Sequence, residues 1–207
     1  MIRPPAWDGV AFSSQVDGDM SHDVDARTAV ANRLAINPDW ATVRQVHGTR
    51  VVRVAAPGEA GEADALWTTT PDVPLAILTA DCFGVVLQAD DAVGVAHCGW
   101  RGIAGGVLGG LRQAMTASGH EPRRASVGPG IGQCCFEVGP EVADEFEGHI
   151  ARTTWNTTSV DLRAALRQQL PGLDHWAVET CTRHDPGWFS HRRDGDARRL
   201  AAIGWLR

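Results

Sequence analysis

The stretch "LAILTADCFGVVLQADDAVGVAHCGWRG", residues 75–102, carries most of the information about the fold. It holds three nearly continuous apolar runs, which are "LAILT", "GVVLQ" and "VGVAH". Short apolar runs bounded by turn residues are typical of strands that are covered on both faces. The short connections between these runs, such as "ADDA", favour hairpins and therefore a mixed sheet over a purely parallel one.

Further helical and strand-like segments lie on both sides of this stretch. The predicted helices have apolar residues at helical spacing or favourable first residues, and occupy residues 24–36, 103–118, 140–149 and 159–170. Ser159 is the expected N-cap of the last helix. The other predicted strands occupy residues 42–46, 51–55, 124–127 and 175–180, and a Gly- and Glu-rich loop is expected over 56–65. These elements predict an α/β layered sandwich with a mixed central sheet.

Composition and charge narrow the class of protein. The chain has 207 residues, of which 43% are hydrophobic, and this size suits one domain over residues 1–207. Its net charge of -6 argues against a broad nucleic-acid-binding surface. It has neither an apolar run long enough to span a membrane nor a visible secretory signal, so we expect a cytoplasmic protein without membrane partners. Five cysteines in such a chain indicate core packing or chemistry, not a disulfide framework.

Three residues with metal-binding side chains end apolar strands. His47 follows "TVRQV", Cys82 follows "LAILTAD", and His97 ends "VGVAH". Imidazole and thiolate suit zinc, and three protein ligands would leave a fourth position open for chemistry. The spacing matches no local zinc motif, however, and an ordinary turn and core would also accommodate these residues. Cys98 is expected to pack behind His97, because neighbouring side chains of a strand point to opposite faces.

Arg101 and Gly102 lie at the start of the predicted helix that follows. Backbone N–H groups at a helix start and a planar guanidinium both favour an anion such as phosphate or carboxylate. A surface arginine beside an ordinary helix start is the alternative. The segment 181–195, "CTRHDPGWFSHRRDG", is expected to form either a substrate-facing lid or a solvated basic turn. Cys134 and Cys135 either line a pocket or fill the core.

Several of these segments together resemble a known family. The segments "QVHGTRV", "LTADC", "AHCGWRG", "GPGIGQCCFEV" and "FSHRRDG" are similar in order and spacing to motifs of the YfiH family, from about residue 40 to the C-terminus. Its members are described as polyphenol oxidases (laccases), as purine nucleoside phosphorylases with adenosine deaminase activity, and as peptidoglycan editing factors. The resemblance implies an α/β domain akin to the catalytic fold of the cytotoxic necrotising factors. It also implies a catalytic zinc held by His47, Cys82 and His97, with copper as a possible substitute.

The chain departs from the usual family pattern at three places. Cys98 stands where alanine is usual, and Gly84 stands where a proline is usual, which predicts a looser loop there. In the tail, Ala197 and Arg198 replace a Thr-Gly pair while Arg199 is retained. These departures bear on the metal surroundings and on the substrate contacts of the tail.

The resemblance favours a zinc-dependent purine nucleoside enzyme that acts by phosphorolysis of adenosine, inosine or methylthioadenosine and by deamination of adenosine. Its partners would be small molecules, namely a nucleoside and phosphate. A histidine that binds zinc is not a free base, so Asp81 or His191 is the candidate for that role. Together with these two residues, Gln45, Arg101 and Gly102 make up the expected substrate- or anion-binding set.

Three other functions remain open from the sequence. The same residues would serve an amidase that edits a peptidoglycan precursor. A copper polyphenol oxidase fits less well, because the chain has 8 histidines and no His-X-His pair. A structural zinc protein without catalysis would use Cys98 as the fourth ligand.

Overall fold

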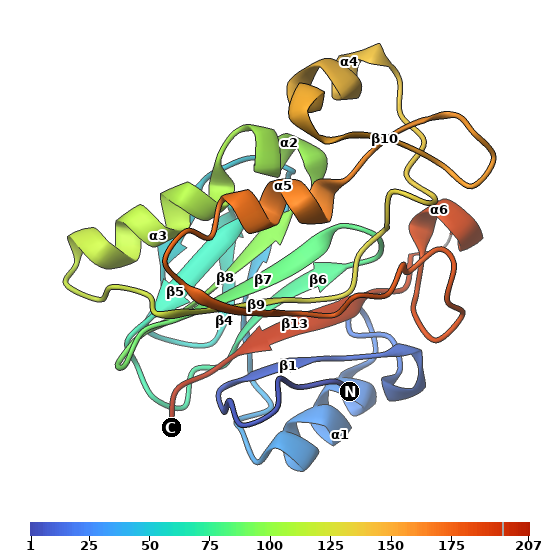
Figure 1. The fold of residues 1–207 in the computed structure, drawn as a ribbon. Coiled ribbons are helices and arrows are strands. Elements are labelled where there is room, and N and C mark those ends of the chain that lie inside the picture. The colour runs from blue at the N-terminus through green and yellow to red at the C-terminus, as the bar shows by residue number, and fades with distance from the viewer. Residues whose placement is uncertain (196) are drawn as a thin grey trace.

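The computed structural model describes residues 1–195 and 197–207, whose strands form two large sheets and a separate hairpin (Figure 1). The five-stranded sheet runs β1 (Val10–Phe12), β13 (Leu200–Gly204), β6 (Leu75–Thr79), β2 (Ala41–Arg44) and β4 (Gly58–Glu62). The six-stranded sheet runs β12 (Asp174–Ala177), β9 (Arg124–Val127), β7 (Phe83–Gln88), β8 (Val93–Cys98), β5 (Ala65–Thr68) and β3 (Val51–Arg53). The hairpin pairs β10 (Ile150–Arg152) with β11 (Thr158–Val160).

Both large sheets mix parallel and antiparallel pairs. In the five-stranded sheet β13 is antiparallel to β6 while β2 is parallel to it. In the six-stranded sheet β7 and β8 form an antiparallel hairpin, and β9 and β12 are parallel. The predicted α/β class with mixed sheets is therefore confirmed, with two facing sheets in place of one central sheet.

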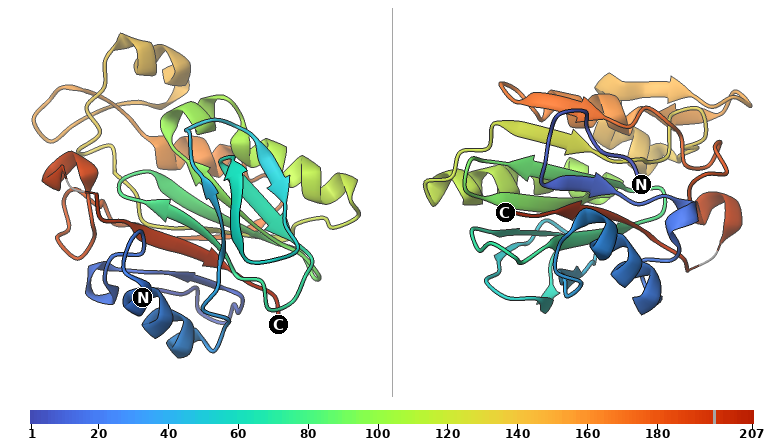
Figure 2. Two further views of the ribbon diagram at one scale, coloured as in Figure 1. Left: turned by 180° about the vertical axis from the view of Figure 1, so that it is seen from behind. Right: turned by 90° about the horizontal axis from the view of Figure 1, so that it is seen from below.

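Helices cover the outer faces of the two sheets (Figures 1 and 2). One layer contains α2 (Trp100–Ala104), α3 (Val107–Ala117) and α5 (Leu162–Gln168), whose apolar residues pack on the six-stranded sheet. On the other side, α1 (Val24–Leu34) packs on the five-stranded sheet. The remaining short helices are η1 (Gln15–Asp17), α4 (Pro140–Ala143), η2 (Asp144–His149) and α6 (His191–Asp194). The result is a fold of four layers, in the order helix, sheet, sheet and helix.

The double burial of the central strands explains their apolar sequence. In β7, Phe83 and Val85 face the helical layer, whereas Val86 faces the core between the sheets. In β8, Val95 faces the sheet–sheet core and Cys98 faces the helices. Each fully buried aliphatic or aromatic side chain contributes about 1.5–3 kcal/mol relative to exposure. Both faces of these strands are therefore apolar, as the sequence predicts.

Two of the connections that cross from one sheet to the other carry candidate site residues. Residues 45–50 leave β2 in the five-stranded sheet and enter β3 in the six-stranded sheet. Residues 80–82 leave β6 and enter β7 in the same way. His47 lies on the first crossing and Cys82 on the second, which places both between the layers.

The structure corrects several predicted boundaries. The helix expected over 103–118 begins earlier, at Trp100, and is split into α2 and α3 at Gly105 and Gly106, because Gly106 adopts a φ of 82° that interrupts a right-handed helix. The segment expected as a loop over 56–65 contains β4.

Two further positions differ from the expectation. The N-cap of α5 is Asp161, whose carboxylate accepts the N–H of Ala164, and Ser159 instead lies within β11. Gly84 is part of β7, where it pairs with His97, and not of a loose loop. A Cβ at Gly84 would lie 2.4 Å from the Cβ of Ala202, so the position has no room for a larger residue.

No helix within the described residues is both long and apolar enough to cross a membrane.

Candidate functional site

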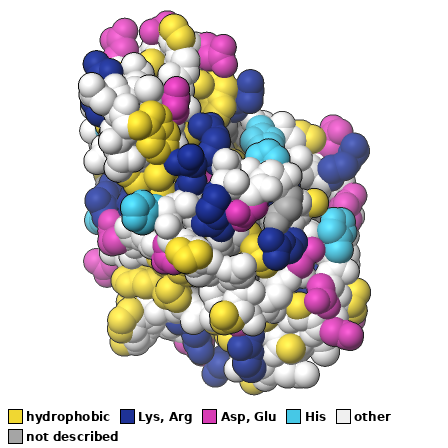
Figure 3. All heavy atoms as spheres, turned by 90° about the vertical axis from the view of Figure 1, so that its right-hand side faces the viewer, with side chains coloured by type: hydrophobic (Ala, Val, Ile, Leu, Met, Phe, Trp, Pro, Cys, Tyr) yellow, Lys and Arg dark blue, Asp and Glu magenta, His cyan; other side chains and the backbone are white. Residues whose placement is uncertain are grey.

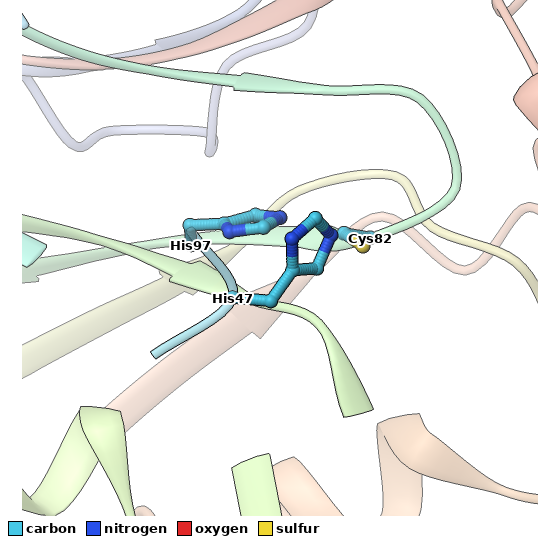
Figure 4. A group of neighbouring side chains, drawn as sticks. All are labelled: His47, Cys82 and His97. Carbon is cyan, nitrogen blue, oxygen red and sulfur yellow. The ribbon is translucent and has the colours of Figure 1, made fainter. Parts of the chain in front are cut away.

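His47, Cys82 and His97 converge at the end of the structure where the two crossings and the end of β8 meet (Figure 4). One ligand atom from each residue lies within 4.8 Å of those of the other two. The two imidazole rings meet edge to face, with centroids 4.7 Å apart. The structure thus brings together the three residues that the sequence analysis selected, although they come from segments far apart in the chain.

A buried carboxylate, Asp64, fixes two of these three residues. Its side chain has no exposure to solvent and accepts the backbone N–H groups of Val46, His47 and Gly48 at 2.6–3.2 Å. It also bonds Nδ1 of His97 at 2.8 Å. Because Nδ1 donates to the carboxylate, Nε2 of His97 is the nitrogen left for a metal. Asp64 was not predicted from the sequence, because it stands alone in the short connection between β4 and β5 with no motif around it.

The backbone near the site is constrained. His47 has a φ of 59° and Asp81 a φ of 88°, both in the left-handed region that residues other than glycine rarely adopt. The three N–H bonds to Asp64 hold the turn at His47 in place. At Gly99, a Cβ would lie 3.1 Å from both Sγ of Cys82 and Cδ2 of His47, so a larger residue there would crowd the three side chains.

The proximity of the three groups changes their acidity. Burial disfavours the thiolate of Cys82, but hydrogen bonds and charge from His47 and His97 outweigh it and lower the pKa of Cys82 to about 7. Burial also disfavours the imidazolium of His97, but Asp64 and Cys82 outweigh it and raise the pKa of His97 to about 9. Without a metal, therefore, a thiolate and an imidazolium form an ion pair near pH 8.

The three side chains line a cavity of about 680 Å³. This volume lies in the range of small-molecule sites. Arginine side chains gather on the face of the molecule that carries α6, as Figure 3 shows. The lining residues outside the three candidate ligands include His22, Gln45, Asp81, Trp100, Arg101, Phe136, His191, Arg192 and Arg199. The cavity thus combines a cluster of metal-binding side chains with cationic and aromatic walls.

Not every predicted binding residue offers a polar group to this cavity. Arg101 lines it, with its guanidinium 4.2 Å from the ring centroid of Trp100. Gln45 lines it too, but its side-chain amide both donates to the carbonyl and accepts the N–H of Leu78 at 2.8 Å. Gly102 is buried away from the lining, where a Cβ would lie 3.2 Å from the carbonyl oxygen of His97.

Asp81 and the α6 part of the segment 181–195 form one side of the cavity. One carboxylate oxygen of Asp81 accepts the hydroxyl of Thr182 at 2.6 Å, and the other accepts the N–H of Arg192 at 2.7 Å. His191 and Arg192 line the cavity from α6. Of this segment, therefore, the part in α6 faces the cavity, whereas residues 181–190 do not line it.

Cys98 lies apart from the three candidate ligands. Cys98 is fully buried in the core beneath the helices, and burial raises the pKa of its thiol. It is not part of the His47, Cys82 and His97 group. His22 lines the cavity as well, and no motif pointed to it because it precedes the part of the chain that carries the resemblance.

Comparisons with known proteins agree with the motifs. Residues 2–207 match the family described as multi-copper polyphenol oxidoreductase laccase. The chain is 39% identical over 190 residues to a purine nucleoside phosphorylase of Deinococcus radiodurans, covering 86% of this chain and 74% of that protein. YlmD of Geobacillus stearothermophilus has a TM-score of 0.85 and 27% identity, covering 99% of this chain and 94% of that one. YfiH of Bacillus licheniformis has a TM-score of 0.85 and 24% identity, covering 96% of this chain and 92% of that one. The chain therefore belongs to the multi-copper polyphenol oxidoreductase laccase family, also known as the YfiH family.

Proposed function

We propose that this chain is a zinc-dependent purine nucleoside enzyme, which cleaves adenosine, inosine or methylthioadenosine with phosphate and deaminates adenosine. The observation that carries the proposal is the convergence of His47, Cys82 and His97 in a cavity with arginines on its walls. The relative named purine nucleoside phosphorylase supports the same class of substrate. We further propose that residues 1–207 act as a single catalytic domain.

The donor set fits zinc. Two imidazoles and one thiol are ligands that zinc prefers, and a site with three protein ligands keeps a position open for water or substrate. The bond from Asp64 to His97 is the outer contact that usually orients a zinc-binding histidine. When bound, zinc would supply Lewis acidity at the cavity floor.

The side chains around the metal-binding residues have separate roles in the proposed phosphorolysis. Arg101 and Arg192 would hold the phosphate, because a guanidinium matches its charge and geometry. A phosphate oxygen then forms a bond to C1′ of the ribose while the bond from C1′ to the purine nitrogen breaks. His191 would donate a proton to the departing purine. Asp81, with both oxygens already hydrogen-bonded, would position α6 and is a weaker candidate than His191 for proton transfer.

Zinc binding at pH 8 is expected to release about one proton per ion, because a zinc-bound imidazole must be unprotonated. The proton comes from His97, whose pKa of about 9 keeps it protonated at pH 8, whereas Cys82 with a pKa of about 7 is already mostly ionised. Affinity should therefore fall about tenfold per pH unit below 9, and more steeply below 7. Calorimetry in two buffers of different ionisation enthalpy measures the protons; equal affinity at pH 6 and pH 9 would contradict the expectation.

Replacing Arg101 by glutamine should raise KM for phosphate about 10- to 100-fold, since a hydrogen bond to a charged group contributes about 1.5–3 kcal/mol. Zinc content and KM for the nucleoside should change little. Arg123→Gln is the matched control, because Arg123 is an exposed arginine that pairs with Asp90 outside the cavity lining. Equal effects of the two substitutions on KM for phosphate would argue against the assigned role of Arg101.

The proposed function is tested by incubating zinc-loaded protein with adenosine, inosine and methylthioadenosine, each with and without phosphate. Phosphate-dependent release of the free base and ribose-1-phosphate supports phosphorolysis, and release of inosine from adenosine supports deamination. Absence of all these products rejects the proposal. A peptidoglycan precursor amide and a phenolic substrate with copper-loaded protein, tested in parallel, examine the two enzymatic alternatives.

A further inference from the structure

A second cluster of thiols lies outside the site described above. Cys134 and Cys135 follow the Gly-rich turn after β9, and Cys181 lies in the segment after β12. The three Sγ atoms lie within 4.8 Å of one another, and those of Cys134 and Cys135 are 3.6 Å apart. None of the three residues lines the cavity, so the proposed enzyme chemistry does not use them.

The surroundings of the cluster differ from those of an ordinary buried cysteine. Cys135 is 3% exposed and belongs to the core, whereas Cys134 and Cys181 are only partly buried and so can be reached from solvent. The backbone N–H of Gly132 donates to Sγ of Cys181 at 3.1 Å, which favours a thiolate at that position. Arg163 interacts electrostatically with Cys181 and would offset part of the negative charge.

The backbone prearranges these three sulfur atoms. A parallel bridge joins Gly130 to Cys181, and Thr182 donates its N–H to the carbonyl of Gly130 at 3.1 Å. A Cβ at Gly132 would lie 3.2 Å from Cβ of Cys181 and 3.4 Å from Sγ of Cys134. The glycine therefore permits the close approach of the two chain segments that brings the thiols together.

We propose that Cys134, Cys135 and Cys181 bind a thiophilic metal ion, Zn²⁺ or Cu⁺, at a second site separate from His47, Cys82 and His97. Soft thiolate ligands select these ions over hard cations. As each metal–sulfur bond forms, a thiol proton passes to solvent, and neither sulfur nor metal changes oxidation state. A site of three thiols without imidazole differs in donor set from the first site, so the two are distinguishable by spectroscopy.

An ion at this position would link two walls of the cavity. The turn that carries Cys134 and Cys135 also carries Ile131 and Phe136, which line the cavity. The segment that begins with Cys181 leads to α6, and the chain between β9 and α4 passes beside α6 (Figure 1). Arg192 of α6 already donates to the carbonyl of Glu137 at 3.1 Å. A metal bridge would reinforce this connection without contacting substrate.

The test is the metal stoichiometry of reduced, metal-free protein titrated anaerobically with Zn²⁺ and, separately, with Cu⁺. At least one of the two ions should reach two equivalents per wild-type chain. The double variant Cys134→Ser/Cys181→Ser should then bind one equivalent, and so should Cys82→Ser, because each keeps the other site. Cys98→Ala, which removes a buried thiol outside both clusters, should still bind two.

Thiol alkylation followed by mass spectrometry gives a second readout that needs no variant. The ion that binds should slow the alkylation of Cys134 and Cys181 in the wild-type protein, in addition to that of Cys82. The proposal is overturned if the reduced protein binds only one equivalent of either ion with no protection of Cys134 and Cys181, or if the double variant still binds two. These results would leave the first site intact, so failure of this proposal is distinguishable from failure of the proposed function.

Discussion

Replacing Cys82 by serine is expected to remove zinc from the site with His47 and His97 and to lower kcat/KM for phosphorolysis by about a thousandfold or more. A serine hydroxyl remains protonated near neutral pH, whereas Cys82, with a pKa of about 7, supplies a thiolate. The lost thiolate is both a soft ligand and the negative charge between two imidazoles. Loss of the Lewis acid costs several kcal/mol of transition-state stabilisation, which corresponds to this factor.

The matched control for this variant is Cys98→Ala. Cys98 lies sixteen positions further along the chain and is buried in the core beneath the helices, outside the group of candidate ligands. Its removal should lower stability modestly through lost packing and leave zinc content and activity unchanged. If Cys98→Ala loses zinc from this site, the structural zinc interpretation replaces the catalytic one. If Cys82→Ser keeps both zinc and activity, the assignment of Cys82 is wrong.

Replacing Asp64 by asparagine should lower zinc affinity about 10- to 100-fold, which is the usual effect of losing an outer contact to a metal-binding histidine. The buried carboxylate accepts three backbone N–H groups and one imidazole N–H, and an amide can accept with only one of its two polar atoms. At least one donor is left without a partner. The free energy of unfolding should therefore fall by about 2–4 kcal/mol. Zinc competition with a chelator and urea unfolding of metal-free protein measure the two effects.

Asp17→Asn separates the effect on zinc from the effect on folding. Asp17 is also a buried carboxylate, and it binds Arg33, the N-terminal amine and Ser14 without being part of the cavity lining. These contacts, although opposed by burial, lower the pKa of Asp17 to about 2. Its replacement should destabilise the fold and leave zinc affinity unchanged. An equal loss of zinc affinity in both variants would show that Asp64 acts only through general stability.

Much of the fold follows from local sequence. The apolar runs at 75–79, 84–88 and 93–97 form strands whose two faces are both buried. An apolar run without alternating polar residues is typical of such strands. The division into two sheets does not follow, since β6 and β7 are separated by only a few residues and yet pair in different sheets. Pairing partners depend on contacts between distant segments, such as β6 with β13 near the C-terminus.

The three candidate metal ligands were predictable from the sequence, whereas the carboxylate that holds two of them was not. The strand ends marked His47, Cys82 and His97 as a candidate zinc site, but their spacing matched no zinc motif, and the family motifs supplied most of the support for it. Asp64 had no such mark, because its role depends on contacts with residues distant in the chain. These are the backbone N–H groups of the turn at residues 46–48 and Nδ1 of His97. Gly102 was selected for a long helix that begins after it, and the structure places it inside the short helix α2 instead.

The most direct test of the account is anomalous diffraction at the zinc absorption edge from crystals of the zinc-loaded protein. The predicted result is a peak within bonding distance, about 2.0–2.3 Å, of one nitrogen of His47, Sγ of Cys82 and Nε2 of His97. The contradicting result is an active preparation in which no metal lies between these three side chains and His97 bonds directly to Cys82.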